Sequence, residues 1–384
     1  MPSSHRRTWL RRAALAAVAT SAAALALASV LVAPARAATQ LPVNYDFIAG
    51  ATATALAPDT PPPGANNWSC QLTAAHPDPV ILVHGTFANM DDNWQAASPL
   101  LANNGYCVYA FNYGGTSSTS PIQGIGDIAA SAAQLATFVN TVLAATGASK
   151  VDLVGHSQGG MMPRYYINFL GGASKVNDFV ALAPSNYGTT LDGITELASL
   201  LDASSAINGT LSQVCPACVE QEQGSAFLAN LNATPTVPGV HYTVIESVDD
   251  EVVTPYTNAF LPAASDVTNI TVQNQCILDG SDHLEIAADP IALADMLNAL
   301  DPAAPVHVPC LVVLPVTGPV GPVPNIYGRS RALERAGSAH HTVGGPGRAF
   351  ARREDLGRKA RYTRANHPSR TRFPRSFDNS CYMR

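Results

Sequence analysis

The chain has 384 residues, which is enough for one large domain or two small ones. It is 47% hydrophobic and 13% charged, a composition that provides a sizeable core and excludes wholesale disorder. Charge divides it into three regions. Residues 1–37 carry five arginines and no acid, residues 38–310 carry 3 basic against 24 acidic residues, and residues 311–384 carry 14 against 4.

Residues 1–37 have the three parts of an export signal. After a positive start, Ala13 to Ala33 is an uninterrupted run of small and apolar residues, and Ala35-Arg36-Ala37 offers a cleavage site. The stretch that begins at Arg6 also resembles a twin-arginine export motif. We therefore predict that this signal is removed and that the protein is secreted. The alternative is an uncleaved membrane anchor, because the run is long enough to span a bilayer. No later segment is expected to cross a membrane.

Strands and helices are expected to alternate from residue 78 to residue 300. Short apolar runs bounded by Pro or Gly are typical of strands buried on both faces, and they predict strands at 78–85, 106–114, 151–155, 178–184, 241–247 and 269–278. Apolar residues at helical spacing predict helices at 93–105, 125–147, 159–170 and 290–300. The alternation indicates βαβ units, and therefore an α/β fold with a mostly parallel sheet and helices on both faces.

Two segments break this alternation. Residues 186–236 are rich in Gly, Ser, Thr, Asn and Leu, and an insertion between sheet strands is where a cap or lid over a site would lie. A short apolar helix at 191–201 fits either such a cap or a helix packed on the core. Residues 311–384 are dominated by Pro, Gly and Arg without any periodicity, which predicts a basic, disordered tail. The domain between signal and tail is expected at 38–310.

The chain has seven cysteines. In the oxidising environment that export implies, cysteines are more often paired in disulfides than metal-bound or catalytic. Cys215-Pro-Ala-Cys218 has the spacing of a metal or redox pair, but no second pair accompanies it. We therefore expect a local disulfide and no metal site, with Cys381 as the unpaired residue.

The stretch VDLVGHSQGGM, residues 151–161, carries the strongest chemical signal. A predicted strand ends in Gly-His-Ser-Gln-Gly and a predicted helix follows, the context in which Gly-x-Ser-x-Gly indicates a nucleophilic serine on a sharp turn. Gly155 and Gly159 have no side chains where strand and helix pass close to Ser157. The helix N-terminus behind the serine favours developing negative charge. We predict that Ser157 is a nucleophile rather than a serine of an ordinary glycine-rich loop.

A neutral serine needs a base, and in folds of this kind the order along the chain is serine, acid, histidine. That order removes the histidines before Ser157. His241 opens a strand before any acid loop, and the tail histidines lie in the predicted disordered segment. His283, in ILDGSDHLEI, lies in a loop between the last predicted strand and the last helix, where the base belongs. His307, among prolines, is the alternative.

The acid that orients the base is expected after a late strand. HYTVIESVDDEVV ends such a strand in three consecutive acids, Asp249, Asp250 and Glu251. The spacing to the two following valines makes Asp250 the candidate. The other two are expected to be solvated.

Two backbone N–H groups are expected to bind the oxyanion of an acyl-transfer reaction. One belongs to Gln158, the residue after the nucleophile, and the other to the loop after the first strand, where Thr86 follows Gly85. The Thr86 hydroxyl could add a third donor. His84 in this loop is expected to be structural.

These residues resemble secreted lipases of the α/β-hydrolase fold, both bacterial triacylglycerol lipases of the actinobacterial type and the yeast enzyme called lipase B. The resemblance covers about residues 66–310 and rests on the ordered blocks HGTFANMDDNW, GHSQGG, FVALAPSNYGTTLDG, SVDDEVVTP and CILDGSDH. Matched block by block, the family's nucleophile, acid, base and two oxyanion donors fall on Ser157, Asp250, His283, Thr86 and Gln158.

The resemblance implies more than a site. It implies a small cap insertion, disulfides Cys70–Cys107 and Cys276–Cys310 with Cys215–Cys218 as an addition, and no metal or organic cofactor. The substrate it implies is a lipid or other ester, met at a lipid–water interface. We expect a monomer with no nucleic-acid partner.

Three other functions are compatible with the sequence. A short-chain carboxylesterase or cutinase-like enzyme would use the same triad, and an acyltransferase would replace water by an alcohol. A non-enzymatic surface-binding protein could keep the fold and use the basic tail to contact an anionic wall or nucleic acid. The presence of all three triad candidates disfavours the last function.

Overall fold

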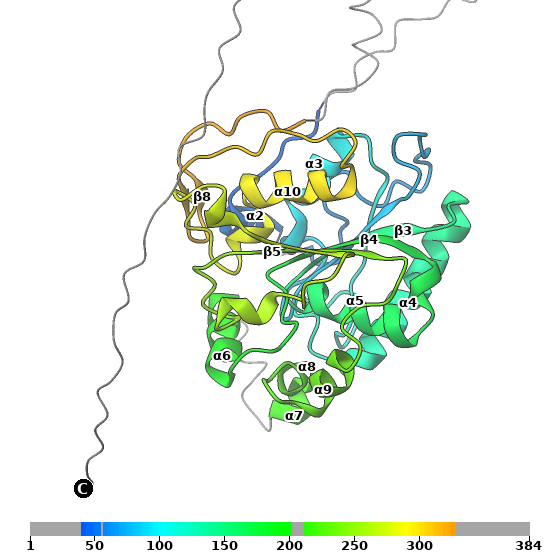
Figure 1. Cartoon of the computed structure of the whole chain (residues 1–384), viewed down its shortest axis with the longest axis vertical. Helices are drawn as coiled ribbons and strands as arrows, with labels where there is room; N and C mark the ends of the chain where they lie inside the picture. The colour runs from blue at the N-terminus through cyan, green and yellow to red at the C-terminus, as the bar shows by residue number, and fades with distance from the viewer. Residues whose placement is uncertain (1–39, 55–56, 202–210, 328–384) are drawn as a thin grey trace, which may run out of the picture. The chain divides into compact units, whose positions relative to one another are not determined.

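The structure is a computed structural model that describes residues 40–54, 57–201 and 211–327 (Figure 1). The predicted export signal, Cys381 and the part of the predicted tail beyond residue 327 lie outside these residues.

One parallel sheet of six strands organises the described residues, in the order β2-β1-β3-β4-β5-β6. The strands are β1 (Val80–Val83), β2 (Val108–Ala110), β3 (Val151–His156), β4 (Val176–Leu182), β5 (His241–Glu246) and β6 (Val267–Thr271). Every residue of β1 and β3 is buried, as their apolar runs predict for a sheet covered on both faces. The strand order reverses between β1 and β3. In sheets of this type, the carboxyl ends of the strands at such a reversal form the usual binding site.

Helices cover both faces of the sheet. Figure 1 shows α3 (Ala97–Asn103) and α10 (Pro290–Leu300) on one face, and α4 (Ile128–Thr146) and α5 (Gln158–Phe169) on the other. Sequence signals define the ends of α4: the Asp127 carboxylate accepts the N–H of Ala130, and Gly147 closes the helix in a left-handed conformation. The result is the α/β-hydrolase fold, which confirms the predicted fold class.

Helix α4 is long and apolar enough to cross a membrane, by length and composition alone, and is the one such helix in the described ranges. It buries one face, including Leu135, Val139 and Val142, and contacts α5. A one-sided apolar stripe of this kind is typical of a helix packed on a soluble core.

The strand predicted at 269–278 is correct only for its first three residues and wrong from residue 272 onward. Strand β6 ends at Thr271, and a 3-10 turn, η5 (Val272–Asn274), follows. The apolar residues Ile277 and Leu278 prolonged the apparent strand, but they are 88% and 52% exposed. Their apolar character therefore does not indicate burial.

The insertion at 186–236 contains four helices in its described residues, joined by turns. It contains α6 (Leu191–Leu200), α7 (Leu211–Val214), α8 (Pro216–Glu220) and α9 (Ala226–Asn232). Helix α6 buries Ile194 and Leu197, as a helix packed on the core would. Gly193 faces the carbonyl oxygen of Val252 so closely that an added Cβ would collide with it. Helix α6 therefore lies against the loop that follows β5.

Helix α8 is anchored on the N-terminal end of α4. The N–H of Ala217 donates to the carbonyl oxygen of Ile125 at 3.2 Å, and the Glu220 carboxylate accepts the N–H of Ile128 at 2.8 Å. The second bond gives an acceptor to the backbone N–H of Ile128, which has no acceptor within α4 because it lies in the first turn of the helix. The position of α8 is thus fixed by one contact with the segment before α4 and one with the first residue of α4.

Residues 311–327 pack against the N-terminal segment, so the prediction of a tail that begins at 311 is wrong for this stretch. They form the short antiparallel strands β7 (Val313–Leu314) and β8 (Gly318–Pro319). The carbonyl oxygen of Val316 accepts the N–H of Ile48 in α2 (Phe47–Thr54) at 3.1 Å. Two-residue strands are too short to show a period in the sequence, which explains the missed boundary.

Three disulfides are present in the described residues: Cys70–Cys107, Cys215–Cys218 and Cys276–Cys310. The first ties the segment before β1 to the edge of β2, and the last ties the loop after η5 to the segment after α10. These two bridges close loops between residues 37 and 34 positions apart, which restricts the unfolded chain, whereas Cys215–Cys218 is local to the start of α8.

Glu285 connects the N-terminal segment to the loop after β6. Its side chain is fully buried in η6 (Glu285–Ala287), and Oε2 accepts the N–H of Phe47 at 3.1 Å. Burial raises the pKa of Glu285 to about 9; the bond from Phe47 opposes this shift, and nearby carboxylates add to it. The carboxyl group is therefore protonated at neutral pH in the folded protein but ionised in the unfolded chain.

Replacing Glu285 by Gln should weaken the loss of stability with rising pH. A carboxyl group whose pKa is raised in the folded protein contributes fully to the free energy of unfolding at a pH below its unfolded pKa, about 4.3. This contribution is lost as the pH rises through the pKa of the folded protein. Between the unfolded and the folded pKa, Glu285 alone can lower the free energy of unfolding by up to about 1.4 kcal/mol per pH unit. The melting temperature of the Glu285→Gln variant, measured by circular dichroism at several pH values, should therefore fall less steeply with rising pH than that of the parent.

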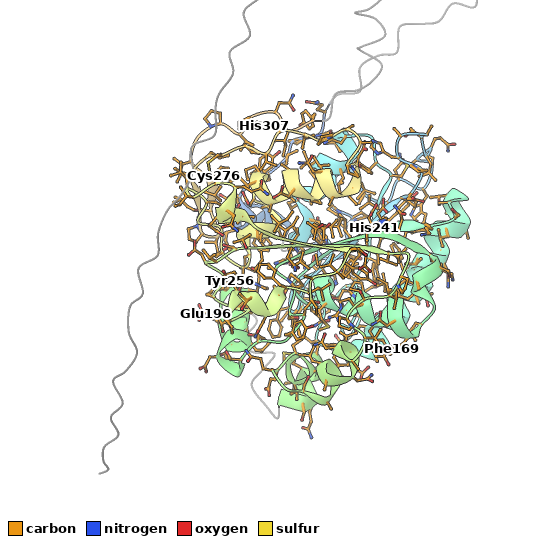
Figure 2. All side chains as sticks on the ribbon, in the orientation of Figure 1. Phe169, Glu196, His241, Tyr256, Cys276 and His307 are labelled. Atoms are coloured by element: carbon orange, nitrogen blue, oxygen red, sulfur yellow. A yellow bond between two sulfur atoms is a disulfide. The ribbon has the colours of Figure 1, made fainter. Side chains whose placement is uncertain are left out.

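Glu196→Gln, at an exposed position of α6 (Figure 2), is the control. Parallel curves for Glu285→Gln and parent would contradict the assignment.

Candidate active site

Ser157 occupies a strained turn between β3 and α5. Its φ of 55° and ψ of −123° lie in a region that residues with a side chain rarely adopt. A Cβ on Gly155 would collide with the carbonyl oxygen of Gly159, and one on Gly159 would collide with that of Val83 in β1. The two glycines of the motif are therefore required by the close approach of β3, α5 and β1.

The structure brings Ser157, His283 and Asp250 together from three distant segments. Ser157 Oγ lies 2.9 Å from His283 Nε2, and His283 Nδ1 lies 2.8 Å from Asp250 Oδ2. A carboxylate can only accept, so Nδ1 carries the imidazole proton and Nε2 accepts the serine O–H. This arrangement can remove the proton from the serine hydroxyl.

Asp250 is held in place by the backbone of its own loop. Its Oδ1 accepts the N–H groups of Val252 and Val253 at 2.8 and 2.7 Å, which leaves Oδ2 for the imidazole. Asp249 is exposed, as expected for a solvated acid. Glu251 is half-buried and accepts the backbone N–H of His283 at 3.3 Å, so it supports the base rather than being solvated.

The surroundings of His283 shift its proton affinity in opposite directions. Complete burial lowers the pKa of the imidazole, whereas the charge and hydrogen bond of Asp250 raise it, with help from Glu251 and Asp282. The carboxylates prevail, and the pKa of His283 lies above its ordinary value of 6.5. At a pH above this raised pKa, the imidazole is neutral and can accept a proton.

The other candidate histidines lie away from Ser157. His241 begins β5, at the end of the parallel sheet opposite to Ser157, and pairs with Asp178 at 3.0 Å. His307 is exposed in the segment after α10 (Figure 2). Of the histidines weighed within residues 40–327, His283 is the one that contacts the serine.

Two buried histidines support the site without being bases. His156 donates from Nε2 to the carbonyl oxygen of His283 at 2.7 Å, and its Nδ1 contacts the amide of Asn93. His84 donates from Nδ1 to the carbonyl oxygen of Gly85 at 2.8 Å and so holds the loop after β1. Burial lowers the pKa of His156 to about 3 and that of His84 to about 4, so both stay neutral.

Thr86 and Gln158 lie side by side next to the serine. A Cβ built on Gly85 would stand 3.1 Å from the Cβ of Ser157, and Gln158 Nε2 donates to Thr86 Oγ1 at 2.8 Å. Gln158 is the first residue of α5, where helix geometry leaves backbone N–H groups without intrahelical acceptors. The two predicted oxyanion donors thus flank the serine side chain.

Sequence reasoning missed two polar side chains at this site. Gln221 Nε2 donates to Thr86 Oγ1 at 2.9 Å, and Ser185 Oγ donates to Gln221 Oε1 at 2.8 Å. Both are nearly fully buried. Ser185 lies in the block FVALAPSNYGTTLDG, which gave no sign of a contact with Gln221, and the position of Gln221 within the insertion is the only signal that the sequence offers for that residue.

The site contains no cluster suited to a metal. Among the described residues, no group of three or more His, Cys, Asp or Glu side chains is arranged to hold a metal ion.

The fold and these contacts define an α/β-hydrolase-fold protein with a serine–histidine–aspartate arrangement. A sequence profile of the family described as lipase (class 2) matches residues 77–293, which is more than half of the chain. The chain therefore belongs to the class 2 lipase family.

Two curated relatives match a shorter stretch. Proteins named triacylglycerol lipase from Pseudarthrobacter phenanthrenivorans and from Burkholderia plantarii are each 46% identical over 92 residues. The match spans 23% of this chain, and 27% and 24% of the two relatives. The chain thus matches about a quarter of the length of each.

Solved structures resemble the chain more distantly. Aspergillus fumigatus lipase B is 21% identical, with a TM-score of 0.47, over 67% of this chain and 56% of that one. The mature form of Bacillus licheniformis lipase BlEst2 is 17% identical, with a TM-score of 0.42, over 63% of this chain and 96% of that one. The fold assignment itself follows from the strand order and helix placement described above.

Replacing Glu251 by Gln should lower the pKa of His283. The substitution removes one of the negative charges that favour the imidazolium, and we therefore expect the pKa of His283 to decrease. The titration of the His283 ring, followed by nuclear magnetic resonance, measures this directly. Asp249→Asn is the matched control because it removes an adjacent but exposed charge. Equal effects of the two variants, or a parent pKa below 6.5, would contradict the electrostatic account.

Proposed function

We propose that this protein is a secreted serine lipase that hydrolyses carboxylic esters, including triacylglycerols, through an acyl-enzyme. The observation that carries the proposal is the chain of hydrogen bonds from Asp250 through His283 to Ser157, at 2.8 and 2.9 Å. Membership of the class 2 lipase family and the names of the two curated relatives support the choice of an ester substrate.

Acylation begins with the serine. His283 Nε2 takes the proton of Ser157 as Oγ attacks the ester carbonyl, and Asp250 stabilises the resulting imidazolium. The imidazolium then gives its proton to the leaving alcohol. The negative charges that raise the pKa of His283 favour the first of these transfers, because a more basic imidazole takes the serine proton more readily.

The oxyanion is stabilised by preorganised donors. The backbone N–H groups of Thr86 and Gln158 and the hydroxyl of Thr86 surround the carbonyl oxygen as it gains negative charge. Water, activated by the same imidazole, then attacks the acyl-enzyme and releases the fatty acid. No step requires a metal or an organic cofactor.

Export and domain organisation belong to the same proposal. Residues 1–37 act as a cleaved signal, the catalytic domain follows, and the residues beyond 327 form a basic tail outside the catalytic domain. Disulfides in the described residues support an oxidising location. The protein acts as a monomer, and the helices of the insertion at 186–236 form a cap beside the site.

Replacing Ser157 by Ala should abolish hydrolysis without unfolding the protein. We expect kcat to fall by roughly 10⁴-fold or more, because the imidazole loses the nucleophile it activates. Release of butyrate from emulsified tributyrin and of nitrophenol from p-nitrophenyl butyrate measures the activity. Ser174→Ala, an exposed serine outside the site, is the control.

Other outcomes would redirect the proposal. Cleavage of the soluble ester alone would make the protein a short-chain esterase, and a preference for alcohols over water would make it an acyltransferase. A folded parent that cleaves neither substrate would overturn the proposal and favour a binding protein. Full activity in the Ser157→Ala variant would overturn the mechanism.

A further inference from the structure

Gln221, at the C-terminal end of α8, connects the insertion to the loop after β1. Its Nε2 donates to Thr86 Oγ1 at 2.9 Å and to the carbonyl oxygen of Ala217 at 3.1 Å. Its Oε1 accepts the hydroxyl proton of Ser185 at 2.8 Å. Gln221 is 2% exposed, so these bonds are shielded from water and orient the amide.

The Thr86 hydroxyl accepts a second hydrogen bond of the same kind. Gln158 Nε2 donates to Thr86 Oγ1 at 2.8 Å and to the carbonyl oxygen of Gly124 at 2.8 Å. Since each amide also faces a carbonyl oxygen, which can only accept, both amides present nitrogen to Thr86 rather than oxygen. The hydroxyl therefore receives two hydrogen bonds from groups that cannot accept its proton.

Two incoming bonds determine what the hydroxyl can still do. A hydroxyl oxygen has two lone pairs and one proton, and both lone pairs of Thr86 Oγ1 are occupied. Among the hydrogen bonds of the described residues, none has Thr86 Oγ1 as the donor. Its proton therefore remains available to an acceptor that arrives next to Ser157.

We infer that Gln221 is a positioning residue: together with Gln158, it makes the Thr86 hydroxyl a dedicated donor to the oxyanion. This inference rests on the proposed ester hydrolysis. Gln221 acts through Thr86, and its effect should appear in the transition state, where the acceptor gains charge. The insertion thus contributes to the oxyanion site as well as lying beside it.

A purely structural role for Gln221 makes a different prediction. A buried amide that only stabilised the fold would change the melting temperature and leave kcat of the folded enzyme unchanged. A residue that positions Thr86 should lower kcat with little change in KM, and only while position 86 has a hydroxyl. A double-mutant cycle between positions 221 and 86 separates the two roles.

The experiment measures kcat and KM for p-nitrophenyl butyrate in the full chain. Gln221→Leu, which keeps the approximate size of the side chain, should lower kcat roughly 10-fold and change KM less than about 2-fold. The same loss should occur in a Thr86→Ser background, which retains the hydroxyl, and should vanish in a Thr86→Val background. Gln223→Leu, an exposed amide two residues away, is the control.

Each outcome has a distinct meaning. Unchanged kcat in Gln221→Leu, or the same loss in the Thr86→Val background, would overturn the positioning role while the proposed function stands. A wild-type chain without activity sensitive to Ser157→Ala would overturn both. If Gln221→Leu fails to fold, Gln221→Met gives the same test, because it keeps an unbranched side chain of similar length and removes the amide that donates to Thr86 Oγ1. It should then lower kcat in the same direction, and an unchanged kcat would overturn the inference.

Discussion

The close approach of three backbone segments around Ser157 is the constraint on which the site depends. Strand β3, the first turn of α5 and the end of β1 meet where Gly155 and Gly159 leave no room for a Cβ. That contact holds Ser157 at a positive φ and places the loop after β1 next to it. Ser157 and the two backbone donors proposed for the oxyanion are therefore positioned by the sheet itself, before any side-chain contact is made.

Asp250 exerts the strongest charge effect on the imidazole of His283, and Glu251 and Asp282 add to it. His84 and His156 are buried and neutral, so they align neighbouring groups without repelling an imidazolium. Asp250 faces His283 with one oxygen while two backbone N–H groups hold the other. Beyond this pair, the groups around Thr86 are neutral, because Gln158 and Gln221 both donate to its hydroxyl, Gln221 from the insertion. A neutral, prearranged donor set favours charge that develops during the reaction over charge already present.

The sequence predicts most of the sheet and the arrangement around Ser157, because buried strands, helical periods and Gly-x-Ser-x-Gly are local signals. Local patterns also mislead: exposed Ile277 and Leu278 extended a strand beyond Thr271, and the two short strands after residue 311 left no period to detect. No local sequence pattern indicates the contact between Gln221 and Thr86. The role of Gln221 depends on where α8 docks, and that docking is a tertiary contact between segments far apart in the chain.

The most direct test of the account is a crystal structure of the protein after reaction with an alkyl phosphonate ester, which mimics the tetrahedral intermediate. The account predicts a covalent bond from phosphorus to Ser157 Oγ. It also predicts that one phosphonyl oxygen lies about 3 Å from the backbone nitrogens of Thr86 and Gln158 and from Thr86 Oγ1. Attachment at another residue, no attachment in the folded protein, or an oxygen directed away from these three donors would contradict it.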